Sequence, residues 1–223
     1  MPVSNYYERS QVSAAIDAGQ HREVIGGMWE EIGGLQLNFL KTHGLLPHHR
    51  LLDIGCGSLR LGVKAVAYLD AESYWGTDLN PDLLSSGYDR EIVPAGLAPK
   101  LPREHLVEDD RFSFPAVERH IDFAIAQSVF THLPLSYLTT CLVGLEHHLK
   151  SPCRFFFTVF VAGDPYDRPF EQASGIVTHA DRDPYHYRMD DLQAASLGTS
   201  WKLNFLGDWS HPRNQKMVEA QLA

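Results

Sequence analysis

The stretch Leu51-Leu52-Asp53-Ile54-Gly55-Cys56-Gly57-Ser58-Leu59-Arg60-Leu61-Gly62 decides the fold of this chain. Its apolar beginning predicts a buried strand, its Gly-x-Gly centre predicts a tight turn, and its end predicts a helix. In this order, backbone N–H groups collect at a helix N-terminus, and glycines carry no side chain that would keep a ligand away. α/β proteins hold nucleotide-like cofactors in this way, at the carboxyl edge of a parallel sheet. The stretch therefore predicts such a site and leaves the cofactor open.

Strands alternate with helices from residue 50 to the end of the chain. The predicted strands are 50–54, 73–77, 105–108, 121–126, 154–161, 202–208 and 216–222, and the predicted helices are 58–69, 81–93, 134–149 and 190–197. This alternation is typical of a three-layer α/β sandwich with a mostly parallel, seven-stranded sheet. The last two strands have no helix between them, so we expect a reversed β-hairpin at the sheet edge.

The segment before the first strand has a helical pattern over residues 11–43. Apolar residues recur there every three or four positions, at Ile25, Met28, Ile32, Leu35 and Phe39. The pairs Gly26-Gly27 and Gly33-Gly34 weaken a helix, and each is expected to mark close packing, a kink or a break into two helices. We divide the chain into an N-terminal helical lid, residues 1–47, and an α/β domain, residues 48–223.

The composition narrows the classes of partner. The chain has 223 residues, 44% of them hydrophobic, and a formal net charge of −9. Nucleic acids and anionic membranes are bound by clustered Lys and Arg side chains, so we expect neither as a partner. No apolar run is long enough to span a bilayer, and the first residues lack the apolar segment of a signal peptide. Three unpatterned cysteines, Cys56, Cys141 and Cys153, favour free thiols and a cytoplasmic location.

Two cofactors fit the glycine turn: a nicotinamide dinucleotide and S-adenosylmethionine. A dinucleotide site requires a third glycine three positions after Gly57, where this chain has Arg60. Asp53 lies within the strand before the turn, where a carboxylate reaches the ammonium of a methionine moiety through ordered water. Leu51–Gly62 accordingly resembles motif I of the class I S-adenosylmethionine-dependent methyltransferases. For Arg60 itself two roles stay open, a contact with a substrate carboxylate and a salt bridge to an acidic neighbour.

Further segments agree with this resemblance. Tyr74–Asn80 ends a strand with Asp78, about 20 residues after the turn, where a carboxylate holds a ribose diol. The alternative role for Asp78, a helix N-cap, is already filled by Asn80 before a proline. Ile121–Pro134 is similar to the family's fourth strand and the loop that flanks the methyl donor.

Glu108–Phe112 follows the third strand, where the family places a polar residue against the adenine amine. We prefer Asp110 to Asp109 for this role. The resemblance thus implies S-adenosylmethionine as the cofactor. Its predicted contact residues are Asp53, Gly55, Cys56, Gly57, Asp78, Leu79, Asp110, Arg111, Gln127 and Ser128.

Related enzymes carry helices before the sheet that lie over the cofactor. The residues of this chain at the corresponding place include Tyr6, Tyr7, His21, Arg22 and Trp29. Arg22 is a candidate partner for the methionine carboxylate, with a surface arginine as the alternative.

Histidines supply the candidate bases, because imidazole takes up a proton near neutral pH. His132 follows the fourth strand at the cofactor edge and is the first candidate, with a backbone-bonded helix-start residue as the alternative. His179 and His186, in the polar loop 178–188, are the runners-up. The same loop also carries Asp181 and Asp183, a spacing that suggests a divalent metal. Asp-Arg-Asp is equally typical of a local ion-pair network, and we assign no metal.

The sequence therefore predicts a methyltransferase that acts on a small molecule, preferably on a hydroxyl oxygen of a secondary metabolite or sugar. The alternatives are methylation of nitrogen or carbon, an S-adenosylmethionine-binding protein without transferase activity, and an NAD-linked enzyme. The small acceptor is the expected partner, and a second copy of the chain in a homodimer is the other partner that we allow.

Overall fold

A computed structural model describes residues 9–150 and 152–222, so Tyr6 and Tyr7 lie outside the described residues. The helices are α1 (Arg9–Asp17), α2 (Trp29–Thr42), α3 (Arg60–Tyr68), α4 (Pro81–Gly87), the π-helix η2 (Tyr88–Ile92), the 3₁₀ helices η3 (Ala98–Lys100) and η4 (Arg103–His105), α5 (Leu135–His148) and α6 (Met189–Ala195). The strands are β1 (Leu51–Ile54), β2 (Tyr74–Asp78), β3 (Leu106–Glu108), β4 (Phe123–Ala126), β5 (Arg154–Val161), β6 (Phe170–Glu171), β7 (Val177–Thr178), β8 (His186–Tyr187), β9 (Trp201–Asp208) and β10 (Lys216–Leu222).

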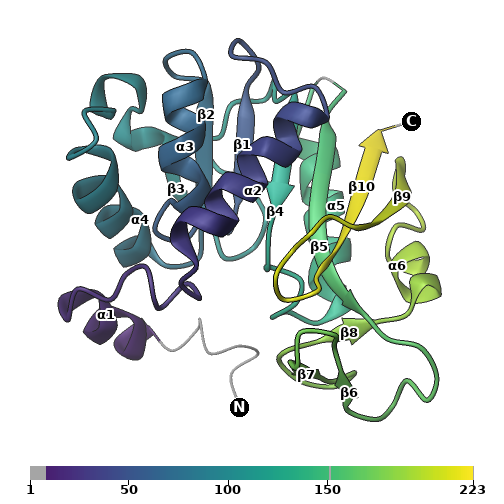
Figure 1. Cartoon of the computed structure of the whole chain (residues 1–223). Helices are drawn as coiled ribbons and strands as arrows, with labels where there is room; N and C mark the ends of the chain where they lie inside the picture. Colours follow the sequence, from purple (N-terminus) through teal and green to yellow (C-terminus); the bar gives the residue numbers. More distant parts are fainter. Residues whose placement is uncertain (1–8, 151, 223) are drawn as a thin grey trace.

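The central sheet has the predicted mostly parallel character. Its strand order is β3-β2-β1-β4-β5-β10-β9, and β8 pairs with the end of β5. The first five strands in this order run parallel, whereas β10 is antiparallel to both β5 and β9 (Figure 1). The reversed hairpin is thus confirmed, with β10 inside the sheet and β9 at its edge.

Alternate residues of the strands enter two hydrophobic cores, one on each face of the sheet. Leu52, Ala124 and Phe155 pack with α5 and α6, whereas Leu51 and Phe156 pack with α2, α3 and α4. Successive strand side chains point to opposite faces, so a run that is apolar at every position is buried on both sides. This packing confirms the three layers of the predicted fold.

The helical pattern over residues 11–43 is interrupted. The backbone leaves the helix after Asp17 and re-enters it at Trp29, with Gly26 and Gly27 at φ values of 93° and 61°. The second glycine pair lies inside α2, where a Cβ on Gly33 would lie 2.7 Å from the backbone oxygen of Arg60. The first pair therefore marks a break and the second pair includes a close contact. α2 itself belongs to the helical layer, and residues 9–28 lie at one end of the sheet (Figure 1).

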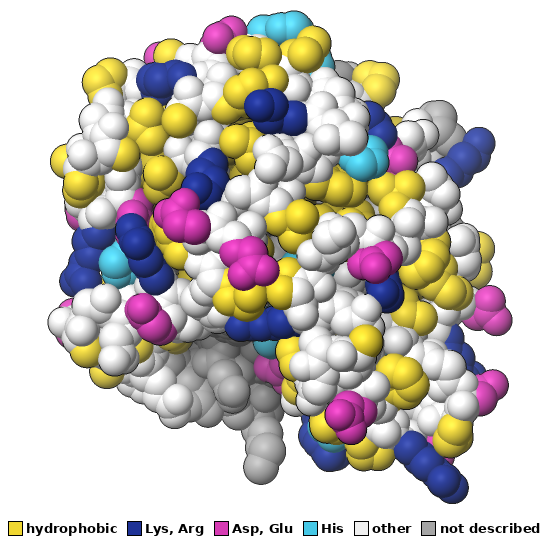
Figure 2. Space-filling model, in the orientation of Figure 1, with side chains coloured by type: hydrophobic (Ala, Val, Ile, Leu, Met, Phe, Trp, Pro, Cys, Tyr) yellow, Lys and Arg dark blue, Asp and Glu magenta, His cyan; other side chains and the backbone are white. Residues whose placement is uncertain are grey.

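Two segments lie at the carboxyl end of the parallel strands, apart from each other (Figure 1). The insertion after β5, residues 163–188, forms the β6–β7 pair and β8 at this end, and α1 lies at the same end beyond α4 (Figure 1). On the face that Figure 2 shows, described side chains of both charges are interspersed, without a broad field of one sign. Among the described helices, none combines the length and the apolar composition that a bilayer crossing requires.

Candidate active site

A cavity lies where β1, β2 and β4 end, under the segment that precedes α2. It encloses about 960 Å³, part of it open to solvent. Most of the predicted site residues line it, namely Asp53, Gly55, Cys56, Gly57, Asp78, Leu79, Asp110, Gln127, Ser128 and His132. Arg111, His179 and His186 do not belong to its described lining. The strand ends thus gather residues that are up to 79 positions apart, from Asp53 to His132.

The glycine turn differs from the expectation in one respect. Its backbone N–H groups do not point into the cavity, because those of Gly55 and Cys56 donate to the carbonyl of Thr77 at 2.8 and 3.0 Å. The N–H of Gly57 donates to Oδ2 of Asp78 at 2.8 Å. The end of β2 lies beside the turn and satisfies it, and α3 begins only at Arg60, two residues later than predicted. The turn therefore shapes the cavity wall rather than supplying a ring of free donors.

Close packing explains the two glycines. A Cβ on Gly55, at φ 68°, would lie 2.5 Å from Cγ2 of Val129. A Cβ on Gly57, at φ 55°, would lie 2.9 Å from Cγ2 of Ile25. Left-handed backbone and contacts this short exclude any larger residue. The turn thus joins the segment before α2 to the loop after β4. Cys56 between the glycines is buried, and burial raises the pKa of its thiol well above the usual range, as expected of a filler.

Asp78 ends β2 with both carboxylate oxygens engaged by backbone. Oδ2 accepts from Gly57 and Oδ1 accepts from the N–H of Asn80 at 2.9 Å. Burial raises the pKa of Asp78 to about 6, although these backbone donors oppose the shift. Asn80 caps α4 by accepting from the N–H of Asp82 at 3.0 Å, so Asp78 is not the cap. Each carboxylate oxygen has further lone pairs, which leaves acceptor capacity toward the cavity.

Two buried hydrogen-bond acceptors, Asp53 of β1 and Gln36 of α2, line the cavity. Asp53 accepts from the hydroxyl of Tyr74 at 2.7 Å, and burial raises its pKa to about 7 against the opposing effects of Tyr74 and Arg60. Gln36 of α2 is 3% exposed and lines the same cavity, and its Oε1 has no hydrogen-bond partner. A buried acceptor without a donor costs free energy unless a ligand satisfies it. Asp53 and Gln36 thus form a site that favours a cationic donor.

Arg60 brings a buried guanidinium to the same region. It donates to Oε1 of Gln127 at 2.7 Å and to the carbonyl of Gly27 at 2.9 Å. Arg60 thus connects the segment before α2 with the loop after β4, and its charge reaches Asp53. Arg22 lies elsewhere and pairs with Glu91, whose buried carboxylate it contacts through two nitrogens at 2.6 Å. Between the two arginines, Arg60 is the one that lines the cavity.

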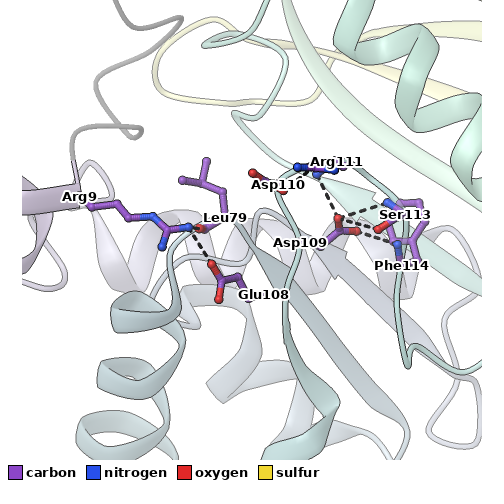
Figure 3. Close-up of polar contacts among 8 residues, drawn as sticks. All are labelled: Arg9, Leu79, Glu108, Asp109, Asp110, Arg111, Ser113 and Phe114. Atoms are coloured by element: carbon purple, nitrogen blue, oxygen red, sulfur yellow. Dashed lines mark hydrogen bonds and ion pairs between the residues drawn. The ribbon is translucent and has the colours of Figure 1, made fainter.

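The two neighbouring aspartates after β3 have different surroundings (Figure 3). Asp109 accepts from the N–H and hydroxyl of Ser113, both at 3.2 Å, and from the N–H of Phe114 at 2.7 Å. It therefore fixes the loop. Asp110 also lines the cavity and pairs with the exposed Arg111 at 3.6 Å. Of the two, Asp110 has the carboxylate that is less committed to the loop backbone.

A polar cluster follows β4. Ser128, at φ 62°, donates its N–H to Oγ1 of Thr158 at 2.8 Å. Gln215, the residue before β10, accepts a hydrogen bond from the hydroxyl of Thr158. Its amide also donates to the Ser128 hydroxyl at 2.7 Å and accepts from it at 3.0 Å. The ring of His211 contacts Gln127 at 3.1 Å, and burial lowers the pKa of His211 to about 4, with a contribution from Arg60 and Arg213. The loop after β4 is thus held by side chains of the C-terminal hairpin.

His132 pairs with a residue of the insertion. Its Nδ1 lies 2.6 Å from Oδ1 of Asp183, with the two side chains 28% and 18% exposed. The insertion docks beside this pair, because the N–H of Tyr185 donates to the carbonyl of Thr131 at 2.8 Å. His132 lines the cavity, so the pair connects the cavity with the insertion.

The other candidate histidines have structural surroundings. His186 is fully buried, with one ring nitrogen 2.9 Å from the Thr178 hydroxyl and the other 3.0 Å from the carbonyl of Tyr166. His179 lies at the bridge to Tyr185, and partial burial and the charge of Arg182 lower its pKa. Within residues 9–150 and 152–222, no three His, Cys, Asp or Glu side chains are grouped to hold a metal ion. The structure therefore separates the four residues whose spacing suggested a metal.

Sequence reasoning missed the contributions of Ile25, Gln36, Asp183 and Gln215 to the site. Gln36 carried a weak signal, since it is a polar residue between the apolar stripe positions Leu35 and Phe39. Asp183 and Gln215 lie 51 and 88 residues from their partners His132 and Gln127, and no local pattern links them.

Searches with protein-family models gave no match to this chain. Among solved structures, it is similar to an S-adenosylmethionine-dependent methyltransferase from Clostridium acetobutylicum ATCC 824, with 15% identity over 95% of this chain and 99% of that one and a TM-score of 0.61. Magnesium protoporphyrin IX methyltransferase from Synechocystis PCC 6803, solved with S-adenosylmethionine, gives 13% identity, coverages of 86% and 81% and a TM-score of 0.57. The glycopeptide N-methyltransferase MtfA, solved with S-adenosylhomocysteine, has 13% identity over 86% of this chain and 90% of that one, with a TM-score of 0.58. At these identities the likeness establishes the fold alone, the Rossmann-like fold that these methyltransferases share.

Proposed function

We propose that this protein is an S-adenosylmethionine-dependent methyltransferase that acts on a small molecule. The observation that carries the proposal is the pair of buried acceptors in the cavity, Asp53 and the unpartnered Oε1 of Gln36. A dinucleotide pyrophosphate, which is anionic, would be repelled there, whereas the ammonium of a methionine moiety supplies the missing donor. Neighbours of the same fold were solved with S-adenosylmethionine or S-adenosylhomocysteine, which supports this cofactor.

The cavity offers a partner for each part of this cofactor. Asp53 and Gln36 would hold the ammonium, and Arg60 would hold the carboxylate. Asp78 would accept from the ribose hydroxyls, and Asp110 would accept from the adenine amine. Leu79 and Ile25 supply apolar surface for the adenine ring. Of the remaining residues predicted to contact the cofactor, Gly55, Cys56, Gly57, Gln127 and Ser128 line the cavity, and Arg111 does not.

When bound, S-adenosylmethionine supplies a methyl group on a positively charged sulfur. The chain must then align the acceptor behind that methyl group and exclude water. We propose a hydroxyl oxygen as the acceptor atom, because His132 lines the cavity and can take up the hydroxyl proton. Methylation of nitrogen or carbon is the alternative, and binding without transfer is the second candidate.

Two further parts of the proposal concern the surroundings of the chain. A cytoplasmic location is supported by Cys56, Cys141 and Cys153, which are free and buried thiols. Residues 1–47 are proposed as an N-terminal lid, supported by the contact of Ile25 with the glycine turn, although α2 within this range packs into the helical layer on the sheet. The homodimer stays a prediction.

Isothermal titration calorimetry on the full chain tests the cofactor. We expect binding of S-adenosylmethionine and S-adenosylhomocysteine and none of NAD. Release of S-adenosylhomocysteine across a library of small hydroxyl and amine compounds then separates an enzyme from a binding protein. Binding of NAD without either sulfur compound would contradict the proposal.

The pH dependence of binding tests the role of Asp53. In the free protein the buried carboxyl has a pKa of about 7, far above its ordinary value, so it holds a proton that the unfolded chain has lost. Stability of the free protein therefore falls as the pH rises from about 4 to about 7, whereas affinity for a cationic ligand rises as Asp53 ionises. We expect Asp53→Asn to remove the contribution of this carboxyl to both trends, whereas Asp78, whose pKa burial raises to about 6, still titrates in the variant. A binding profile that is the same in wild type and in this variant from about pH 5.5 to about pH 8 would assign the ammonium to other residues.

A further inference from the structure

We propose that Asp183 positions His132 so that Nε2 of His132 accepts the proton of an aromatic hydroxyl, which makes a phenol the acceptor class of this enzyme. The inference rests on the proposed function, because a proton acceptor at this place has a use only beside a methyl donor. In this assignment Asp183 is a positioning residue, since it acts through His132.

The contact between the two side chains defines which ring nitrogen is basic. An ionised carboxylate only accepts hydrogen bonds, so Nδ1 of His132 carries the proton that reaches Oδ1 of Asp183 across 2.6 Å. Neutral imidazole has one protonated nitrogen, and Nε2 is then the proton acceptor. The same carboxylate stabilises the imidazolium that forms when Nε2 takes up a proton.

Asp183 is held by a docked segment of the insertion. On its C-terminal side, the N–H of Tyr185 donates to Thr131, and the hydroxyl of Tyr187 donates to the carbonyl of Leu133. β8 then pairs in parallel with the end of β5, through Phe160 and His186. These contacts bracket His132 on both sides in the sequence. The insertion therefore presents Asp183 from a fixed platform to the loop that carries His132.

Other ionisable groups surround the pair. Tyr185 and Tyr187 lie on the same segment, and the negative charge of Asp183 contributes to raising the pKa of both, after burial. Asp181 and Tyr137 also interact with Tyr185, and His179 is bridged to it. Asp109 and Asp110 line the same cavity as His132. Among these, Asp183 is the group whose carboxylate contacts the ring of His132.

The walls beside His132 select the acceptor class. Val129, Leu133 and Phe112 line the cavity together with His132 and offer apolar surface. Phe112 in turn packs against Phe130 and Tyr137, with ring centroids 6.1 and 6.5 Å apart. An apolar wall with one basic nitrogen fits a flat aromatic ring that carries a hydroxyl better than a highly hydroxylated sugar.

The proton transfer is balanced within the chain. The O–H bond of the phenol breaks, its proton forms an N–H bond at Nε2 of His132, and the bonding pair stays on the oxygen as the nucleophile. Water takes the proton from the imidazolium after the methylated product leaves.

A measurement without turnover tests the tautomer. Two-bond ¹H–¹⁵N correlation spectra of the full chain, labelled at histidine and assigned with a His132→Gln sample, report which ring nitrogen is protonated. We expect Nδ1 of His132 to carry the proton in wild type and in Asp181→Asn, and a mixture of tautomers in Asp183→Asn. Asp181→Asn is the matched control, because Asp181 lies in the same insertion and forms its ion pair with the exposed Arg182, at 3.6 Å, rather than with His132. A proton on Nε2 in wild type would overturn the inference.

Turnover with a series of substituted phenols, followed by S-adenosylhomocysteine release, tests the chemistry. We expect Asp183→Asn to lower kcat about 100-fold for weakly acidic phenols and much less for phenols that are already ionised, with partial rescue by Asp183→Glu. The affinity for S-adenosylmethionine should stay unchanged, which also shows that the variant is folded.

The outcomes distinguish the inference from the proposed function. Equal losses for all phenols, or no turnover of any phenol while S-adenosylmethionine still binds, overturn the role of Asp183 and leave the cofactor in place. Failure to bind S-adenosylmethionine overturns the proposed function itself.

Discussion

The two sides of the cavity are built from contacts of different range. On the donor side, formed by β1, β2 and the turns that follow them, Asp53 bonds to Tyr74 and Gly57 bonds to Asp78, each pair 21 residues apart. On the acceptor side, formed by the loop after β4, the insertion and the hairpin loop before β10, His132 meets Asp183 across 51 residues and Ser128 meets Gln215 across 87. The centre of the donor side is thus one strand–helix–strand unit, to which α1, α2 and the loop after β3 add Arg9, Gln36 and Asp110, whereas the acceptor side is assembled entirely from three distant segments.

This difference has a consequence for how the site can change. A change in the insertion or in the hairpin loop alters the acceptor side without touching the β1–β2 unit that we propose holds the donor. Loops on a rigid scaffold commonly carry specificity in this way. The most informative variants are therefore those that show whether a change on one side of the cavity affects the other side.

Gly55→Ala should have the largest effect, because Gly55 is where the two sides touch. Its new Cβ would lie 2.5 Å from Val129, and the residue would have to keep φ 68°. Left-handed strain and overpacking together should cost about 3 kcal/mol or more of unfolding free energy. Denaturant unfolding and S-adenosylmethionine titration measure the loss.

Gly96→Ala is the matched control for that variant. Gly96 has φ 70°, but a Cβ there would meet nothing within 4 Å. Backbone strain should lower its unfolding free energy by about 1 kcal/mol, and it should bind the cofactor like wild type. Equal losses at the two positions would show that Gly55 does not couple the two sides.

Gln215→Ala should have the next effect and should act on the acceptor side. It leaves Thr158 and Ser128 without the amide that both contact, at a cost of roughly 2 kcal/mol. We expect weaker turnover and a smaller loss of S-adenosylmethionine affinity, because Gln215 also contacts Ser128 and Gln127, two of the proposed cofactor contacts. Gln221→Ala, on the exposed part of β10, is the control and should change neither. A loss of cofactor affinity as large as the loss of turnover would remove the distinction between the sides.

Arg9→Ala should have the smallest effect and should act on the donor side. Arg9 donates to the carbonyl of Leu79, the residue after Asp78, at 3.1 Å and pairs with Glu108 at 2.7 Å (Figure 3). Exposed ion pairs contribute little, so the stability change should stay below about 1 kcal/mol. We expect a few-fold weaker binding of S-adenosylmethionine.

Arg103→Ala provides the comparison for Arg9. Arg103 pairs with Asp89, and the exposure of that pair, 54% and 55%, matches the 54% and 48% of Arg9 and Glu108. It should show the same small change in stability and unchanged cofactor binding. Identical binding by both variants would show that α1 does not support Leu79.

The sequence alone determined the order of strands and helices and the place of the donor side. β5 and β10 have the predicted bounds, and the glycine turn, Asp53 and Asp78, which stay predicted cofactor contacts, line one cavity. These features follow from local patterns: apolar runs of strand length, a Gly-x-Gly turn, and a carboxylate at a strand end. Because parallel strands end at one edge of the sheet, residues that follow them are brought together without further information.

Only the tertiary structure decided how the turn is satisfied and which residues make the acceptor side. The N–H groups of the turn donate to Thr77 and Asp78, because β2 lies beside β1 at bonding distance. His132 acquired Asp183, and His186 was buried between Thr178 and Tyr166, through the docking of one insertion. Long-range contacts of this kind depend on the packing of whole segments, which leaves no periodic or local signature in the sequence.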